Sequence, residues 1–209
     1  MMPRLQKKYK EEILPKLKKE LNCSNDLMAP RLEKVVVNVG FGSKSKEPKY
    51  QETIENTLTR ITGQKPLNTI AKKSISNFKL RKGTVVGMKA TMRNKRMYDF
   101  VDKLINVSLP RVRDFRGLRT TVVDSNGNLN IGFKEHLSFP EISSDEVEQI
   151  HGLEITLVST AKDKNDGYLL FEMLGFPFNK ELKKEKKAKS KSFNNFKNKK
   201  PNETNEVKS

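Results

Sequence analysis

Apolar residues recur at two distinct spacings along the first 180 residues, and each spacing predicts a different kind of element. Spacings of three and four residues are typical of amphipathic helices, whereas β-branched runs and alternation are typical of strands. The helical spacing predicts helices over 5–21, 48–63, roughly 97–105 and 166–176. The strand patterns predict strands over 34–40, 84–93 and 153–161, and a hairpin over 120–133 with its turn at Asn126-Gly127.

Proline and glycine mark where these elements should end. Pro15 falls inside the apolar stripe of the first helix, so we expect a break or a kink there. Pro48 opens the second helix and Gly63 closes it, which is the usual order of these two residue types. The third helix must end before Pro110, and the last helix should end near Gly175.

The order of strands and helices predicts an α+β domain with a mixed, mainly antiparallel sheet, and not a doubly wound parallel sheet. Helices should cover one face of this sheet. The other face should stay open, because Lys89, Thr91 and Arg93 alternate with apolar residues along their strand. Beyond residue 180 the composition changes to Lys, Asn, Ser and Glu, which predicts a single domain over 1–180 and a disordered basic tail over 181–209.

Charge is distributed in blocks within a chain whose formal net charge is +17. Residues 65–119 hold 15 Lys and Arg against 3 Asp and Glu, and residues 181–209 hold 10 against 4. Residues 120–180 are acidic, with 4 cations against 10 anions. One surface should therefore bind a polyanion, and another should attract a basic partner.

The sequence offers little for catalysis, metal binding or membrane insertion. Only His136 and His151 would titrate near neutral pH, and neither lies in a nucleophile motif. Cys23 is the only cysteine, and no His, Cys or carboxylate spacing suits a metal; "GFGSKS" over 40–45 lacks the pattern of a nucleotide-binding loop. No apolar run approaches the ~20 residues that span a bilayer, and the N-terminus lacks the features of a secretory signal. We therefore expect a cytosolic protein with no cofactor, no metal and no membrane partner.

Two basic stretches favour nucleic acid as the polyanion. "IAKKSISNFKLRKG" over 70–83 combines five cations with Phe78 and no acid, a composition suited to phosphates, riboses and stacking on an exposed base. "PRVRDFRGLR" over 110–119 adds four arginines, whose planar guanidinium groups form paired contacts with phosphate. Because the two stretches flank a strand that also exposes Lys89 and Arg93, we predict RNA or DNA binding.

Two other interpretations of these stretches exist. A run of cations can be a solvated surface without any partner, which is the simpler interpretation of an isolated run. A membrane-surface segment is disfavoured, because the apolar residues of 70–83 do not share one helical stripe.

Several motifs, in unbroken order from about Pro3 to Lys180, resemble one family. They are "PRLEKVVVNVGFG", "ITGQKPLNTIAKKSISNFKLRKG", "LPRVRDFRGL", "HLSFPEI" and "GFPF". They look like the bacterial form of the 5S-rRNA-binding protein of the large ribosomal subunit. The resemblance implies a ferredoxin-like α+β domain in the cytoplasmic ribosome, without enzymatic activity. It also implies attachment of 5S rRNA to the central protuberance beside 23S rRNA, and contacts with P-site tRNA, with other large-subunit proteins and, across a subunit bridge, with a small-subunit protein.

The resemblance assigns roles to residues whose types agree with the patterns above. Asn38, Gln64 and Thr91 correspond to residues with which the family holds 5S rRNA, and the neighbouring cations Lys65, Lys89 and Arg93 are expected to join them. The tRNA-facing loop aligns with 71–82 and gives Lys72, Lys73, Ser74, Asn77, Phe78, Lys79, Arg81 and Lys82. Further rRNA contact is expected at Arg111, Arg113 and Arg116. The bridge falls near 135–153 and gives Glu141, Asp145, Glu146 and Glu148.

Some alternatives stay open at this point. The acidic segment near 141–148 could equally be a solvated loop, although its charge suits a basic partner protein. A free-standing RNA chaperone or regulator would share the same composition, and an RNA-modifying enzyme would need a site that these motifs do not provide. The tail over 181–209 extends past the resemblance, and we expect it to add unspecific rRNA contact through counterion release.

Overall fold

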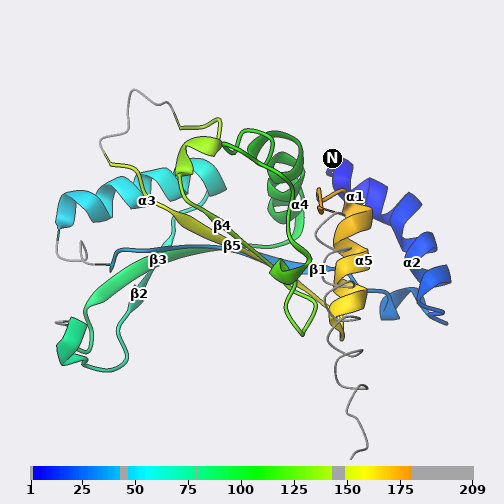
Figure 1. The fold of residues 1–209 in the computed structure, drawn as a ribbon, viewed down its shortest axis with the longest axis horizontal. Coiled ribbons are helices and arrows are strands. Elements are labelled where there is room, and N and C mark those ends of the chain that lie inside the picture. Colours follow the sequence, from blue (N-terminus) through cyan, green and yellow to red (C-terminus); the bar gives the residue numbers. More distant parts are fainter. Residues whose placement is uncertain (1, 43–46, 79, 143–148, 180–209) are drawn as a thin grey trace, which may run out of the picture.

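The protein is seen in a computed structural model that describes residues 2–42, 47–78, 80–142 and 149–179 (Figure 1). Its centre is an antiparallel five-stranded sheet with the order β2-β3-β1-β5-β4. The strands are β1 (Leu32–Gly40), β2 (Leu67–Ile70), β3 (Val85–Met92), β4 (Leu129–Phe133) and β5 (Leu153–Ser159). The α-helices are α1 (Arg4–Lys8), α2 (Leu14–Glu20), α3 (Pro48–Thr62), α4 (Asn94–Lys103) and α5 (Lys164–Leu174).

The connectivity is that of a ferredoxin-like domain. The elements β1, α3, β2, β3, α4 and β5 follow one another as β-α-β-β-α-β, and their strands lie in the order β2-β3-β1-β5. The additional strand β4 pairs with β5 and forms the far edge. The α+β fold class predicted from the sequence is therefore confirmed. The tail over 181–209 lies outside the described residues.

Two strand predictions need correction. The strand β2 was not predicted, because three of its four residues are exposed and no alternation marks it. The hairpin predicted over 120–133 is wrong in its first half, where Thr120–Val122 form a 3₁₀ turn and Val123 makes only an isolated bridge to Leu129. The turn itself does close, since the Asp124 carboxylate accepts hydrogen bonds from the backbone N–H groups of Asn126 and Asn128, but the pairing does not continue before Val123.

The first helix is irregular beside Pro15, but it is not broken. The chain stays helical from Arg4 to Glu20, and residues Tyr9–Ile13 between α1 and α2 form a π-helical turn. Proline has no N–H to donate, and its ring crowds the carbonyl of the preceding turn. A widened turn accommodates it without a break. The apolar stripe therefore stays continuous, with Leu5, Tyr9, Ile13 and Leu17 all buried.

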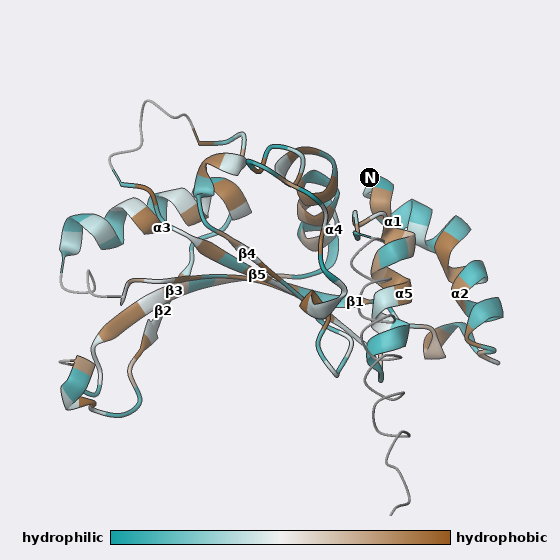
Figure 2. Ribbon diagram, viewed as in Figure 1, coloured by the Kyte–Doolittle hydropathy of each residue, from teal (hydrophilic) through white to brown (hydrophobic). Residues whose placement is uncertain are grey.

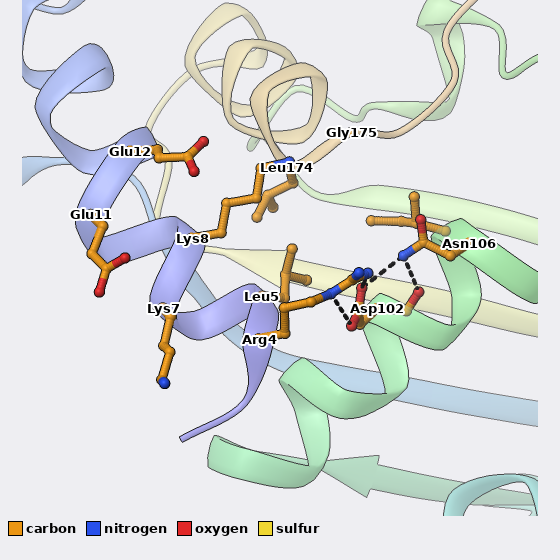
Figure 3. A pocket seen from close by; sticks show the side chains of 11 residues that line it. Arg4, Leu5, Lys7, Lys8, Glu11, Glu12, Asp102, Asn106, Leu174 and Gly175 are labelled. Carbon is orange, nitrogen blue, oxygen red and sulfur yellow. Dashed lines mark hydrogen bonds and ion pairs between the residues drawn. The ribbon is translucent and has the colours of Figure 1, made fainter. Parts of the chain in front are cut away.

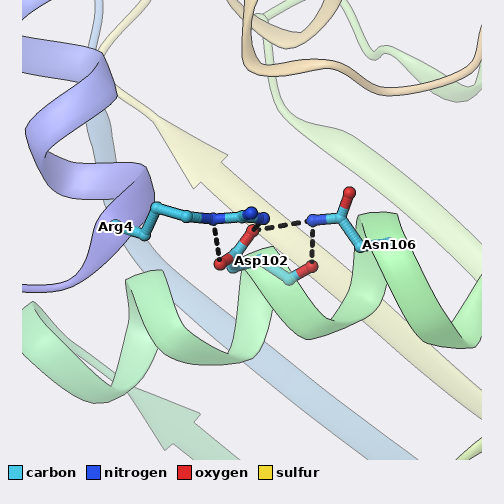
Figure 4. Close-up of polar contacts among 3 residues, drawn as sticks. All are labelled: Arg4, Asp102 and Asn106. Carbon is cyan, nitrogen blue, oxygen red and sulfur yellow. Dashed lines mark hydrogen bonds and ion pairs between the residues drawn. The ribbon is translucent and has the colours of Figure 1, made fainter.

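The N-terminal helix is attached to α4 by a polar network as well as by its apolar stripe. Arg4 donates to both carboxylate oxygens of Asp102, at 3.1 and 2.7 Å, and Asn106 donates to the same carboxylate at 2.7 Å (Figure 4). A surface cavity of about 520 Å³ opens beside this network (Figure 3). Its lining mixes Lys7 and Lys8 with Glu11, Glu12 and Asp102, so its charge favours neither anions nor cations.

The two faces of the sheet differ completely. On one face Val35, Val37 and Val39 pack beneath α3 and α4, and all three are at most 1% exposed. In Figure 1, α3 and α4 lie on this side, and their buried positions appear as apolar stripes in Figure 2. No described helix lies against the opposite side of β2, β3 and the adjoining part of β1. The expectation of helices on one face and an open second face is met.

Candidate nucleic-acid interface

Strand register assembles a row of side chains on the open face. Lys89 of β3 lies opposite Asn38 of β1, and Asn38 lies opposite Glu154 of β5. Leu67 of β2 extends the row beyond Lys89. Neighbouring strands lie roughly 4.8 Å apart, so an ammonium group, an amide and a carboxylate are presented side by side on three successive strands. The predicted orientation of Asn38, opposite to the buried valines, is correct.

A second row runs parallel to the first. Thr91 lies opposite Val36, and Val36 lies opposite Thr156 of β5. All three are partly exposed, and Asn130 of β4 completes the row opposite Thr156. Hydroxyl and amide groups on this row can both donate and accept hydrogen bonds. The contributions of β4 and β5 were not predicted, because nothing local in the sequence reveals which strands become neighbours.

Gln64 connects the helical side of the domain to this surface. Gly63 ends α3 in the left-handed conformation, with φ at 69°, and the chain then turns toward β3. The Gln64 side chain follows the turn, and its Nε2 donates to the carbonyl of Thr91 at 2.8 Å. Its Oε1 has no hydrogen-bond partner among the described residues. One half of the amide thus fixes the turn, and the other half can accept a hydrogen bond.

The cations at the margin of the sheet are held weakly. Lys65 lies 3.1 Å from Glu55, and Arg93 lies 3.5 Å from Glu33, with the two cationic side chains 82% and 54% exposed. Exposed pairs of this kind contribute about 0–1 kcal/mol, so a phosphate could replace the carboxylate at little cost. Lys89 is exposed and makes no ion pair within the described parts of the chain.

Residues 70–83 form the outer part of a hairpin, and not an irregular loop. The backbone pairing of β2 and β3 continues through Ala71 and Thr84. Ile75 and Leu80 then exchange two backbone hydrogen bonds of 3.0 and 3.1 Å. The Ser74 hydroxyl accepts a bond from the Lys82 backbone N–H at 3.0 Å. The hairpin projects from the sheet at the β2 edge (Figure 1).

The hairpin carries both exposed cations and an exposed aromatic ring. Phe78 lies in the 3₁₀ turn Ser76–Phe78 and is 72% exposed. The other predicted residues of this segment are also exposed: Lys72, Lys73, Ser74, Asn77, Arg81 and Lys82. Lys79 lies outside the described residues. No acidic residue occurs in the sequence between Glu55 and Asp99, so the positive potential here is not offset locally.

The three arginines predicted to contact rRNA elsewhere lie apart from this surface. Arg111, Arg113 and Arg116 are located on the segment that follows α4. The first two line a groove beside β4, at the sheet edge opposite to the hairpin. Arg113 lies 3.8 Å from Glu135, a long contact for an ion pair. The structure thus separates the predicted cations into a hairpin group and a β4-edge group.

The predicted bridge residues are described only in part. Asp145, Glu146 and Glu148 lie outside the described residues. Glu141 forms an ion pair with Lys103, which also donates to the carbonyl of Ile61 at 3.0 Å. The Glu141 carboxylate is therefore engaged within the protein.

The two histidines form a buried stacked pair. The rings of His136 and His151 lie 4.0 Å apart and are nearly parallel, and the two residues are 1% and 4% exposed. Burial, and then the neighbouring His136, lower the pKa of His151 to about 4, and burial also lowers the pKa of His136. Within the described ranges no three His, Cys, Asp or Glu side chains are grouped as a metal site. None of the described helices has both the length and the apolar character needed to cross a membrane.

The ferredoxin-like topology, the open polar face and its cationic margin are those of an RNA-binding α+β protein. The sequence pattern of the family described as "Ribosomal protein L5" matches residues 25–81. The pattern of the "ribosomal L5P family C-terminus" matches residues 85–178. The boundary between them falls between β2 and β3, so both matches contribute strands to the same sheet.

Individual relatives match this chain over nearly their whole length. The chain is similar to "Large ribosomal subunit protein uL5" of Halothermothrix orenii, at 49% identity over 84% of this chain and 98% of the relative. The proteins of the same name from Caldanaerobacter subterraneus subsp. tengcongensis and Mycoplasma mycoides subsp. mycoides are 48% and 46% identical. Each of these two matches covers 86% of this chain and 100% of the relative. The chain belongs to the ribosomal protein L5 family, which consists of structural ribosomal proteins and not of enzymes.

Proposed function

We propose that this protein is a structural constituent of the large subunit of the cytoplasmic ribosome, where it attaches 5S rRNA to the central protuberance beside 23S rRNA. The similar proteins are named for the large ribosomal subunit, which supports rRNA and other ribosomal proteins as partners. The observation that carries the 5S rRNA assignment is the open sheet face, where Lys89, Asn38 and Thr91 are presented by adjacent strands.

The chemistry of this face suits RNA backbone and ribose. The Lys89 ammonium group can neutralise a phosphate, while Asn38 and Thr91 offer groups that bond a 2′-hydroxyl. The Gln64 Oε1 lies at the end of the row, next to the carbonyl of Thr91 to which its amide nitrogen is bound. Side chains on strands and a braced turn lose little freedom on binding, which favours affinity.

The hairpin over 70–83 has a separate role in this proposal, which is contact with P-site tRNA. Its cations and Phe78 are exposed on a hairpin that projects beyond the sheet, so they can reach a second RNA while the sheet face holds the first. The contact would be mainly with the tRNA backbone, since lysines bind phosphate without reading sequence. Charge on the acidic segment near 135–153 supports the further contact with a basic small-subunit protein in a subunit bridge.

A paired set of variants tests the assignment. Asn38→Ala combined with Thr91→Ala should lower affinity for 5S rRNA about tenfold without changing the far-ultraviolet circular dichroism spectrum, because both side chains are on the open face and only their hydrogen bonds to RNA are removed. Lys72→Ala combined with Lys73→Ala should leave 5S rRNA affinity within about twofold and weaken tRNA binding to reconstituted subunits. Equal 5S rRNA affinity for the sheet variant and the parent protein would overturn the assignment.

A different measurement distinguishes the proposed function from a competing one, that of a free-standing RNA chaperone. A ribosomal constituent should co-sediment with large subunits in high salt, whereas a chaperone held by charge alone should dissociate.

A further inference from the structure

The groove beside β4 has the features of a site for a single unstacked nucleotide. Its volume is about 430 Å³, within the range of roughly 300–1,000 Å³ that is typical of small-ligand sites. One wall comes from the segment after α4, and the other from β4 and the turn that follows it. The apolar and aromatic lining consists of Leu109, Val112, Phe115, Leu118, Ile131, Phe133 and Leu137.

Phe115 shapes the part of the groove that a base would enter. Phe115 is only partly buried against the core, so part of its ring remains accessible. Gly132 lines the groove through its backbone, because it alternates with Ile131 and Phe133 and lies opposite Glu154 on the open face. An accessible aromatic ring can stack on any base.

The edge of β4 adds hydrogen-bonding groups to this lining. The strand β4 is terminal in the sheet order, so along Ile131, Gly132 and Phe133 no described strand pairs with its outer side. Backbone N–H and C=O groups on such an edge lack ladder partners. These groups can form hydrogen bonds with the polar edge of a base, as side-chain amides do.

The charge at the mouth selects the kind of ligand. Arg111, Arg113 and Lys134 line the groove, against one carboxylate from Glu135, which lies 3.8 Å from Arg113. The arginine guanidinium groups match the geometry of phosphate, and Arg113 has 82% of its side chain exposed. An apolar floor with a cationic mouth is complementary to a base and its flanking phosphates.

We propose that this groove binds one splayed-out nucleotide of ribosomal RNA, with the base between Phe115 and the β4 edge and the flanking phosphates on Arg111 and Arg113. This inference rests on the proposed ribosomal function and adds a second RNA site, at the sheet edge opposite to the hairpin. The same chemistry could be met by a nucleotide of 5S or of 23S rRNA, and separate measurements with each RNA identify the source.

The test distinguishes the contribution of base insertion to RNA affinity from the contribution of charge. Phe115→Ala removes the stacking ring and should lower affinity for one of the two rRNAs about tenfold while leaving the salt dependence of binding unchanged. Phe115→Tyr is the matched control and should bind as the parent protein does, since it keeps the aromatic ring. Arg111→Gln combined with Arg113→Gln should instead reduce the salt slope, by about 0.7 for each phosphate of a single strand that the variant no longer neutralises.

Ultraviolet crosslinking of the full-length parent protein to 5S or to 23S rRNA supplies an independent measurement, which also holds if Phe115→Ala proves unstable. A nucleotide adduct is expected on the peptide that contains Phe115, and the double arginine variant should reduce its yield severalfold. Parent-like RNA binding by Phe115→Ala, together with no adduct at Phe115, would overturn the inference.

Three further outcomes are informative. If Phe115→Ala retains RNA affinity but reduces binding of a large-subunit protein, the groove holds a peptide strand and the inference is wrong. Asn38→Ala with Thr91→Ala serves as the reference for the sheet face. Loss of 5S rRNA binding in that variant without any groove effect would refute the groove site alone, whereas no effect in either variant would also refute the proposed function.

Discussion

The two faces of the central sheet are built from the same strands and have opposite properties. In β1 the odd-numbered residues Val35, Val37 and Val39 are buried beneath helices, whereas Val36 and Asn38 are partly exposed. In β3 the same alternation separates Met88 and Met92 from Lys89 and Thr91. A strand therefore contributes to stability and to RNA recognition through alternate residues. Substitutions on one face should change one property and leave the other intact.

The largest effect is expected on the covered face. Leu58 lies in α3 and is 0% exposed, so Leu58→Ala removes buried apolar surface and leaves a cavity. The free energy of unfolding should fall by about 2–5 kcal/mol, as measured by urea denaturation. Lys89→Ala on the open face is the control. It should change stability by less than about 0.5 kcal/mol, and a larger loss would show that the faces are not independent.

Acidification should also act on the covered side of the molecule. The pKa of His151 is about 4 in the folded protein, below its ordinary value near 6.5, so the unfolded chain binds more protons between these values. The contribution of neutral His151 to the free energy of unfolding is therefore complete above about pH 6.5. This free energy should decrease by roughly 3 kcal/mol as the pH falls toward 4.

His151→Phe is the matched variant for this pH dependence, because it keeps an aromatic ring but binds no proton. Urea denaturation at pH 7 and pH 4.5 should give a smaller difference for the variant than for the parent protein. The same difference in both proteins would assign the acid sensitivity to other groups.

The smallest loss of stability is expected at Gln64, which joins the two faces. Gln64→Ala removes the 2.8 Å hydrogen bond to the Thr91 carbonyl, which should cost about 1 kcal/mol of stability. The variant should also bind 5S rRNA more weakly, because Oε1 is removed and the turn is no longer fixed. A stability loss without any loss of RNA affinity in Gln64→Ala would contradict this dual role.

Much of the fold was accessible from local patterns. The helix over 48–63 was predicted closely because Pro48, the apolar stripe and Gly63 all act within one element. The strand β2 was missed, since only its pairing with β3 identifies it. The hairpin over 120–133 was misread because an Asn-Gly turn signal cannot tell which partner the following strand will choose. Asp124 closes the turn, and β4 pairs with β5 instead.

The candidate interface also has features that were predictable from the sequence and features that were not. The exposure of Lys89 and Thr91 followed from alternation, and the cationic character of 70–83 followed from composition. The placement of Glu154 beside Asn38 could not be predicted from the sequence, because it depends on the register between β1 and β5. Nor could sequence reasoning assign one half of the Gln64 amide to a carbonyl 27 positions further along the chain.

The sequence by itself determined the class of protein, the periodic elements and the surplus of positive charge, since each depends on residue type or on spacing within one segment. Its ordered motifs also carried the family resemblance. The tertiary structure decided which strands are neighbours, that 70–83 extends a hairpin, and that Arg111 and Arg113 stand over a groove at the opposite edge. Those features depend on contacts between residues far apart in the chain, and such contacts form only when the shared apolar core selects one arrangement of its elements.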